Sequence, residues 1–145
     1  LFWRQVEQDA RPLCLKRDLA ILAYSPMAQG LLTGKFGADH RFKPGDHRAQ
    51  NRLFQPGNLK RAHTALAQLG PIASRYNATL GQLALAWVMA QPNSFAIAGA
   101  RNAEQAEQNA AAVQIEIAPE DLAAMDRIGR QITDHLDDDP VMWKW

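Results

Sequence analysis

The chain has 145 residues, of which 47% are hydrophobic and 21% are charged, and its formal net charge is +1. This composition is typical of a globular domain, and the balance of acids and bases gives no indication of nucleic acid or an anionic membrane as a partner. The single cysteine, Cys14, excludes an internal disulfide, and no apolar run approaches the roughly 20 residues of a membrane span. We therefore expect a cytoplasmic protein.

Two short apolar runs predict β-strands, at residues 18–25 (DLAILAYS) and 94–99 (SFAIAG). Both runs are apolar throughout instead of alternating, which is typical of strands that are covered on both faces in a parallel sheet. Residues 6–17 precede the first strand with helical spacing, and we expect Pro12 in the first turn of that helix or at a kink.

The longest helical pattern spans residues 58–76, and the dipeptide Gly70-Pro71 within it predicts a bend or a break. The apolar residues of this segment share one helical face. They are Leu59, Ala62, Leu66 and Leu69.

Helix starts are marked by polar residues at two further places. Residues 79–91 open with Thr79 followed three positions later by Gln82, which is the pattern of a capping box. Residues 102–113 repeat this start with Asn102, again three positions ahead of a glutamine. Both segments are therefore predicted to be helices that begin at these residues.

Residues 119–129 predict a last helix, with Pro119 at a first-turn position and Gly129 as its stop. The acidic and then aromatic tail, residues 131–145, is expected to be irregular chain. Trp143 and Trp145 in this tail could form one wall of a substrate site.

Strands separated by helices are typical of parallel βα units. A (β/α)8 barrel needs about 250 residues and eight strands, and this chain has the content of roughly the last third to half of one. The predicted fold class is therefore α/β, the C-terminal portion of a (β/α)8 TIM barrel, with about two parallel strands and their helices. Residues 1–145 form one partial barrel in this interpretation, and a chain that starts with Leu1 is expected to be a piece of a longer one.

Both strand candidates end in residues suited to binding anions. The first is followed by small residues and glycines and then by Lys35, and the second by Gly99, Ala100, Arg101 and a helix start at Asn102. Backbone N–H groups, a helix N-terminus and an adjacent arginine all favour phosphate. Two such sites on neighbouring strands predict a ligand with separated phosphates.

The segments "AYSPMAQGLLTGKF" and "AGARNAEQAEQNAAA" closely resemble two segments of the aldo-keto reductase family. The linking "LGQLALAWVMAQPN" resembles that family's helix between its last two barrel strands. The resemblance runs from about Trp3 to about Gly129. It implies the C-terminal, cofactor-binding part of an NADPH-dependent oxidoreductase that reduces aldehydes or ketones to alcohols.

By this resemblance, Tyr24 matches the aromatic residue on which the nicotinamide ring stacks, and Lys35 matches a basic residue near the phosphates. Arg48 matches an arginine of a loop that folds over the cofactor, although Arg41 competes for that role. The loop along the pyrophosphate is matched by Ser25, Pro26, Met27, Ala28, Gln29 and Gly30.

The resemblance also assigns the adenosine end of the cofactor. Gly99 and Arg101 match the segment around the 2′-phosphate, and Gln105, Gln108 and Asn109 match helix positions that contact the adenine. Gln105 is equally well explained as a capping partner of the helix start. Gln108 replaces a usual glutamate of the family, which retains a hydrogen bond and loses a charge.

The family's catalytic Asp, Tyr, Lys and His would all lie before this chain begins, so no catalytic residue is assigned here. We also assign no metal ligands, because the four histidines and Cys14 show no ligand spacing. Two other interpretations remain open. One is an NADP-binding regulatory module, and the other is an inactive half-barrel that pairs with a missing N-terminal half or with a second copy of itself.

Overall fold

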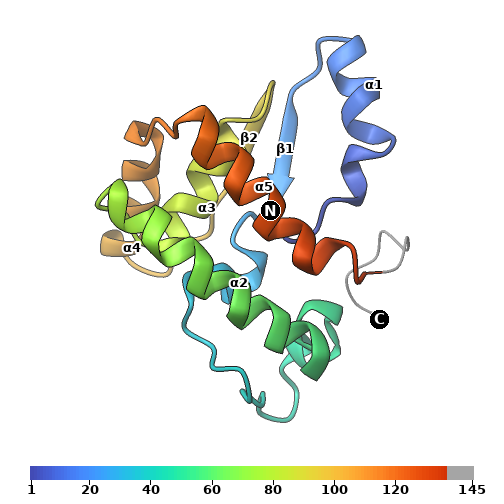
Figure 1. Ribbon diagram of the computed structural model, residues 1–145, viewed down its shortest axis with the longest axis vertical. Coiled ribbons are helices and arrows are strands. Elements are labelled where there is room, and N and C mark those ends of the chain that lie inside the picture. Colours follow the sequence, from blue (N-terminus) through green and yellow to red (C-terminus); the bar gives the residue numbers. More distant parts are fainter. Residues whose placement is uncertain (137–145) are drawn as a thin grey trace.

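The computed structural model describes residues 1–136, which form a pair of parallel strands and a set of helices (Figure 1). Strand β1 (Ile21–Tyr24) pairs with β2 (Ser94–Ile97) in a register that places Ile21 beside Ser94 and Tyr24 beside Ile97. The parallel pair predicted from the two apolar runs is confirmed. Because the strands run in the same direction, both carboxyl ends lie at the same edge of the sheet.

The helices follow the predicted order along the chain. None of them within residues 1–136 is both long and apolar enough to cross a membrane. Short 3₁₀ turns lie between them: η1 (Gln5–Glu7), η2 (Ala28–Thr33), η3 (His47–Gln50), η4 (Arg52–Phe54) and η5 (Ala112–Gln114). The α-helices are α1 (Ala10–Lys16), α2 (Pro56–Arg75), α3 (Leu80–Met89), α4 (Ala103–Ala111) and α5 (Pro119–Thr133).

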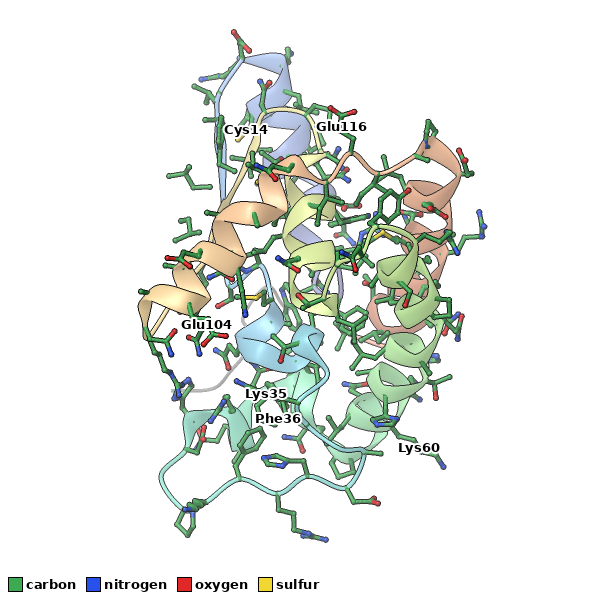
Figure 2. The ribbon with its side chains drawn as sticks, turned by 90° about the vertical axis from the view of Figure 1, so that its left-hand side faces the viewer. Cys14, Lys35, Phe36, Lys60, Glu104 and Glu116 are labelled. Carbon is green, nitrogen blue, oxygen red and sulfur yellow. The ribbon has the colours of Figure 1, made fainter. Side chains whose placement is uncertain are left out.

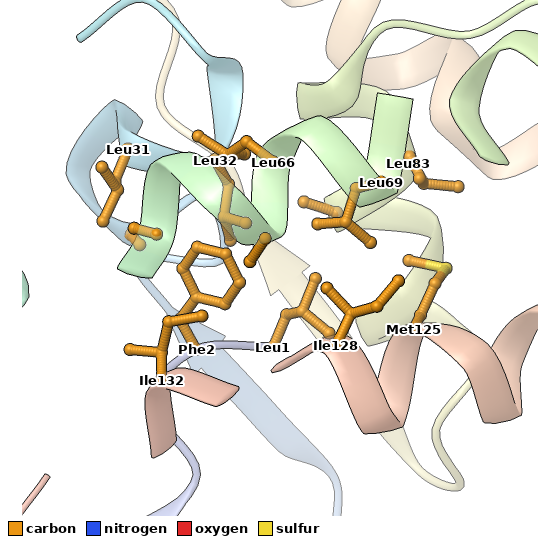
Figure 3. Close-up of a cluster of buried hydrophobic side chains, with 14 of the residues drawn as sticks. Leu1, Phe2, Leu31, Leu32, Leu66, Leu69, Leu83, Met125, Ile128 and Ile132 are labelled. Carbon is orange, nitrogen blue, oxygen red and sulfur yellow. The ribbon is translucent and has the colours of Figure 1, made fainter. Parts of the chain in front are cut away.

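The hydrophobic core lies between α2, α3 and α5. Helices α2 and α5 lie side by side, and α3 contacts both α2 and β2 (Figure 1). Leu1 and Phe2 at the amino end insert into this core next to Ile128 and Ile132 of α5 (Figure 3). The remaining large core side chains include Leu31, Leu32, Leu66, Leu69, Leu83 and Met125 (Figure 3).

Helix α2 is continuous from Pro56 to Arg75, so of the bend or break predicted at Gly70-Pro71 the break is wrong. A proline inside a helix costs about 3 kcal/mol because it removes one backbone hydrogen bond and crowds the preceding turn. Leu69 before the proline and Ile72 after it are both buried in the same core cluster. Packing on both sides of Pro71 therefore outweighs the local preference for a break.

Helix α5 also continues beyond its predicted stop, through Gly129 to Thr133. A Cβ atom at Gly129 would lie 2.6 Å from the carbonyl oxygen of Leu1, which no side chain could tolerate without movement. The Thr133 hydroxyl donates a 3.1 Å hydrogen bond to the carbonyl of Phe2. Gly129 thus allows the close approach of the amino-terminal segment and does not end the helix. The first residues of the predicted tail are helical, and Trp143 and Trp145 lie outside the described residues.

The sheet is covered on one face only within residues 1–136, whereas the apolar runs predicted cover on both. Ala23 and Ala96 pack against the core. On the other face, Leu22 is 65% exposed and Phe95 is 57% exposed. Residues 1–136 therefore do not supply the second cover, because α3 and the core reach only the face of the two alanines.

The tight contact at Gly129 predicts a stability difference between two glycines inside helices. Gly129→Ala should lower the free energy of unfolding by about 1–3 kcal/mol, because the methyl group overpacks the contact with Leu1. Gly70→Ala is the matched control, since a Cβ there meets no atom within 4 Å, and its effect should stay below about 1 kcal/mol. Denaturant unfolding followed by tryptophan fluorescence measures both, and equal effects would contradict the role of Gly129.

Candidate functional site

The loop that follows β1 has an unusual backbone. Ser25, Ala28 and Gln29 adopt positive φ angles of 51°, 50° and 54°, and Gly30 follows at 92°. For residues with a side chain this left-handed conformation costs roughly 1–2 kcal/mol each. Backbone strain of this kind persists only where the surroundings enforce it, and it clusters at binding sites. The strand end is therefore a candidate site on geometry alone.

Internal hydrogen bonds hold this loop in place. The N–H of Ala28 donates to the carbonyl of Ser25 at 2.8 Å, and the N–H groups of Gly30 and Leu32 donate to the carbonyl of Met27 at 3.0 and 3.2 Å. These three donors are used within the loop. These particular N–H groups are therefore not available to an anion bound at the loop.

A cleft of about 950 Å³ opens between the β1 loop, η3 and the segment after β2. Every residue that the sequence singled out for a cofactor lines it, except Ala28, whose side chain is buried below the loop. Arg41 is exposed and does not line the cleft, so the structure favours Arg48 over Arg41 as the arginine of this site. Ala100, which the sequence placed in the anion-binding segment after the second strand, also lines the cleft. Sequence reasoning missed several other lining residues: Thr33, Asp46, His47, Thr79, Gly81, Gln82 and Ile97.

Three cationic side chains, Lys35, Arg48 and Arg101, gather around the cleft. The pKa of Lys35 is lowered by partial burial and, to a smaller extent, by the positive charges of Arg48 and Arg101. Within residues 1–136, neither Lys35 nor Arg101 forms an ion pair with a carboxylate. Among residues 1–136, Asp46 is the carboxylate that lines the cleft beside these positive charges.

The absence of a side chain at Gly30 leaves room for the side chain of Lys35. A Cβ at Gly30 would lie 2.7 Å from both Cε and Nζ of Lys35, so the lysine side chain lies directly over the glycine. Lys35 Nζ also lies 5.0 Å from the centre of the Phe36 ring. Figure 2 shows Lys35 near Phe36, while Lys60 extends from α2 on the other side of that view.

Arg48 is held by an ion pair and by two aromatic rings. Its Nη2 lies 2.5 Å from Oδ2 of Asp46, and the guanidinium holds the pKa of that carboxyl well below its usual range. The guanidinium carbon lies 5.3 Å from the ring centre of Phe36 and 4.9 Å from that of Phe42. Phe54 packs edge-on against both rings, at 5.4 and 4.9 Å, and completes the platform.

The segment after β2 is organised by side-chain amides at the start of α4. Asn102 accepts a hydrogen bond from the N–H of Gln105 at 2.9 Å, as a helix N-cap should. The Gln105 Oε1 in turn accepts from the N–H of Arg101 at 3.0 Å. Gln105 thus has a capping bond, with Arg101 in place of the expected Asn102 as the backbone donor, and it also lines the cleft. Its contact with the adenine stays a prediction.

Two further amides fix the same region. Asn109 donates to the carbonyl of Gly99 at 3.2 Å and ties α4 to the end of β2. Gln108 donates to Glu104 at 3.3 Å within α4. A Cβ at Gly99 would meet no atom within 4 Å, so this part of the cleft has open space beside the backbone.

Comparison with known proteins gives consistent results. The sequence model of the Aldo/keto reductase family matches residues 1–130. An uncharacterized oxidoreductase of Mycobacterium tuberculosis is 42% identical over 118 residues, which are 81% of this chain and 36% of that protein. The NADH-specific methylglyoxal reductase of Escherichia coli is 37% identical over 123 residues, which are 84% of this chain and 37% of that protein.

Solved structures show the same relationship. A glycerol dehydrogenase of Gluconobacter oxydans matches with a TM-score of 0.82 and 28% identity, over 91% of this chain and 41% of that one. An aldo-keto reductase of Klebsiella pneumoniae in complex with NADPH matches with a TM-score of 0.63 and 27% identity, over 99% of this chain and 40% of that one. The chain thus spans 36–37% of the length of the two relatives matched by sequence and 40–41% of the two matched structures.

Partial burial of Lys35 and, to a smaller extent, its two cationic neighbours predict a measurable cost in stability at this residue. A lysine whose pKa falls on folding destabilises the folded state while it is charged, and the cost disappears as the pH rises toward its ordinary value of 10.5. Lys35→Gln should therefore raise the urea midpoint at neutral pH and low salt. The part of the gain that comes from the neighbouring cations should disappear at about 1 M salt, where charges are screened over about 3 Å, and the part that comes from burial should remain.

Lys60→Gln is the matched control, because it removes the same charge from α2, away from the cleft. It should leave the urea midpoint nearly unchanged. If both variants shift the urea midpoint equally, the effect comes from the net charge of the protein and not from the surroundings of Lys35.

Proposed function

Because this chain belongs to the aldo/keto reductase family, we propose that its cleft binds the nicotinamide dinucleotide of an oxidoreductase that reduces aldehydes or ketones to alcohols. The observation that carries this proposal is the meeting of Lys35, Arg48 and Arg101 with the ends of both strands around one cleft. The volume of about 950 Å³ is in the range of cofactor pockets, which run to about 1,000 Å³.

The residues present fit a dinucleotide in their chemistry. Cationic side chains at both strand ends suit two separated phosphate groups. The open space beside Gly99 allows a ligand to approach the backbone closely. Tyr24 at the end of β1 lines the cleft and is 68% exposed. A residue that stacks against a flat ring must be accessible in this way.

We assign the ends of the ligand accordingly. Tyr24 holds the nicotinamide ring, Lys35 and Arg48 hold the pyrophosphate, and Arg101 holds the adenosine 2′-phosphate. When bound, the dinucleotide supplies the hydride that reduces the carbonyl group. The residues of this chain orient it and balance its negative charge.

The proton donor of the reaction is proposed to lie outside this chain. The sequence contains two tyrosines. Tyr24 lies in the proposed ring-binding position, and the hydroxyl of Tyr76 accepts from the N–H of Ala118 at 2.9 Å and donates to Asp121 at 2.7 Å. Tyr76 therefore joins α2 to α5 and has a structural role. We propose in addition that the substrate is a small carbonyl compound. The rest of the barrel would come from another segment or from a second copy of this chain.

Arg101 is the basis for proposing NADP over NAD. A guanidinium can form two parallel hydrogen bonds with a phosphate, and NAD has no phosphate at the ribose 2′ position. The relatives show that both cofactors occur, since the Escherichia coli protein is described as NADH-specific and the Klebsiella pneumoniae structure contains NADPH. The preference must therefore be tested on this chain.

Fluorescence titration of NADPH and NADH with the protein tests this assignment. Arg101→Ala should raise the dissociation constant for NADPH by about 10- to 100-fold, because charge-assisted hydrogen bonds contribute about 1.5–3 kcal/mol. The dissociation constant for NADH should change less than about two-fold, and Lys60→Ala should leave both constants unchanged. Equal affinity of the wild type for the two cofactors, with no loss in Arg101→Ala, would refute the proposal.

A further inference from the structure

Asn51 is a fully buried polar residue that lies behind the cleft and does not line it. Its exposed fraction is 0%. Burying an amide without hydrogen bonds costs several kcal/mol, so a buried asparagine is expected to have specific partners. The partners of Asn51 come from two separate walls of the cleft.

The side-chain oxygen and the backbone N–H of Asn51 both form hydrogen bonds within the segment that carries Arg48. Its Oδ1 accepts from the N–H of Leu53 at 2.9 Å and caps η4. Its backbone N–H donates to the carbonyl of Arg48 at 3.1 Å. The turn that presents Arg48 to the cleft is thus closed by Asn51, and η4 brings Phe54 against the aromatic platform under Arg48.

The side-chain nitrogen of Asn51 reaches the loop after β1. Nδ2 of Asn51 donates to Oε1 of Gln29 at 3.2 Å. Gln29 lines the cleft and lies in the strained left-handed region, with φ 54° and ψ 30°. Such a conformation requires contacts that hold it, and the bond from a buried amide is one.

We propose that Asn51 is a positioning residue that fixes the spacing between the Gln29 wall and the Arg48 wall of the cleft. It touches no ligand and acts through these two neighbours. The choice of NADPH as the ligand in the binding test below rests on the proposed function. The bridge itself is defined by the hydrogen bonds on Asn51.

The test uses two substitutions that break the same hydrogen bond from opposite sides. Asn51→Ser retains an oxygen that can cap η4 but is too short to reach Gln29. Gln29→Met preserves the length of that side chain and removes its acceptor. Each should raise the dissociation constant for NADPH by about 3- to 30-fold. The double variant should bind no more weakly than the weaker single variant, because both changes remove one interaction.

A second ligand separates positioning from general destabilisation. Adenosine 2′-monophosphate retains the 2′-phosphate assigned to Arg101 and lacks both the nicotinamide half and the pyrophosphate assigned to Lys35 and Arg48. Asn51→Ser should change its dissociation constant less than about two-fold. Ile132→Val, a conservative truncation at a fully buried site in α5, is the control and should alter binding of neither ligand.

Amide hydrogen exchange without ligand tests the bridge independently of the cofactor. The N–H groups of Gly30 and Leu32, both bonded to Met27, should exchange several-fold faster in Asn51→Ser and at the wild-type rate in Ile132→Val. If the wild type binds no NADPH, the proposed function fails and this measurement still decides the role of Asn51. Unchanged exchange in Asn51→Ser, or equal weakening of both ligands, would overturn the inference.

Discussion

The parallel pairing of β1 with β2 is the contact on which the candidate site depends. It aligns Tyr24 with Ile97, so that the loop after β1 and the segment before α4 leave the sheet at the same edge. An antiparallel pair, or a shift of register, would separate Lys35 from Arg101. Helix α3 maintains the pairing, because it contacts both β2 and the η2 turn that follows β1.

The cleft combines two features that each lower the stability of the folded protein. Three residues with side chains adopt left-handed backbone conformations in the β1 loop, and three cations lie around one cavity. The core between α2, α3 and α5 and the ion pairs outside the cleft must offset these costs. One example is the link from Arg75 and Tyr76 of the α2 end to Asp121 of α5. An anionic ligand would relieve the repulsion among the cations, so binding and stability are coupled at this site.

Local patterns in the sequence predicted the parts of the structure that local physics decides. The Thr79 capping box is present with both of its hydrogen bonds, and the strands lie where the apolar runs indicated. Most candidate cleft residues were assigned through the resemblance of two segments to one family, and Arg48 was assigned from the loop between those segments. The structure brings all of the candidates except Ala28 to one cleft. Their roles in binding stay predictions.

The wrong predictions have a common cause, since each depends on contacts between distant residues. The continuation of α2 through Pro71 depends on core packing around Leu69 and Ile72, and the continuation of α5 through Gly129 depends on Leu1. Asn51 gave no signal in the sequence, because its role follows from its burial between two loops. The uninterrupted apolar runs indicate cover on both faces of the sheet, and residues 1–136 cover one of them.

The most direct test of the central claim is to map NADPH binding residue by residue with backbone amide chemical shifts. The account predicts that saturating NADPH shifts resonances of residues 25–30, 35, 48 and 99–109, and leaves those of α1 and the exposed part of α2 unchanged. Shifts concentrated around the amino-terminal residues 1–11 and absent from both strand ends would contradict it, and so would the lack of any saturable change.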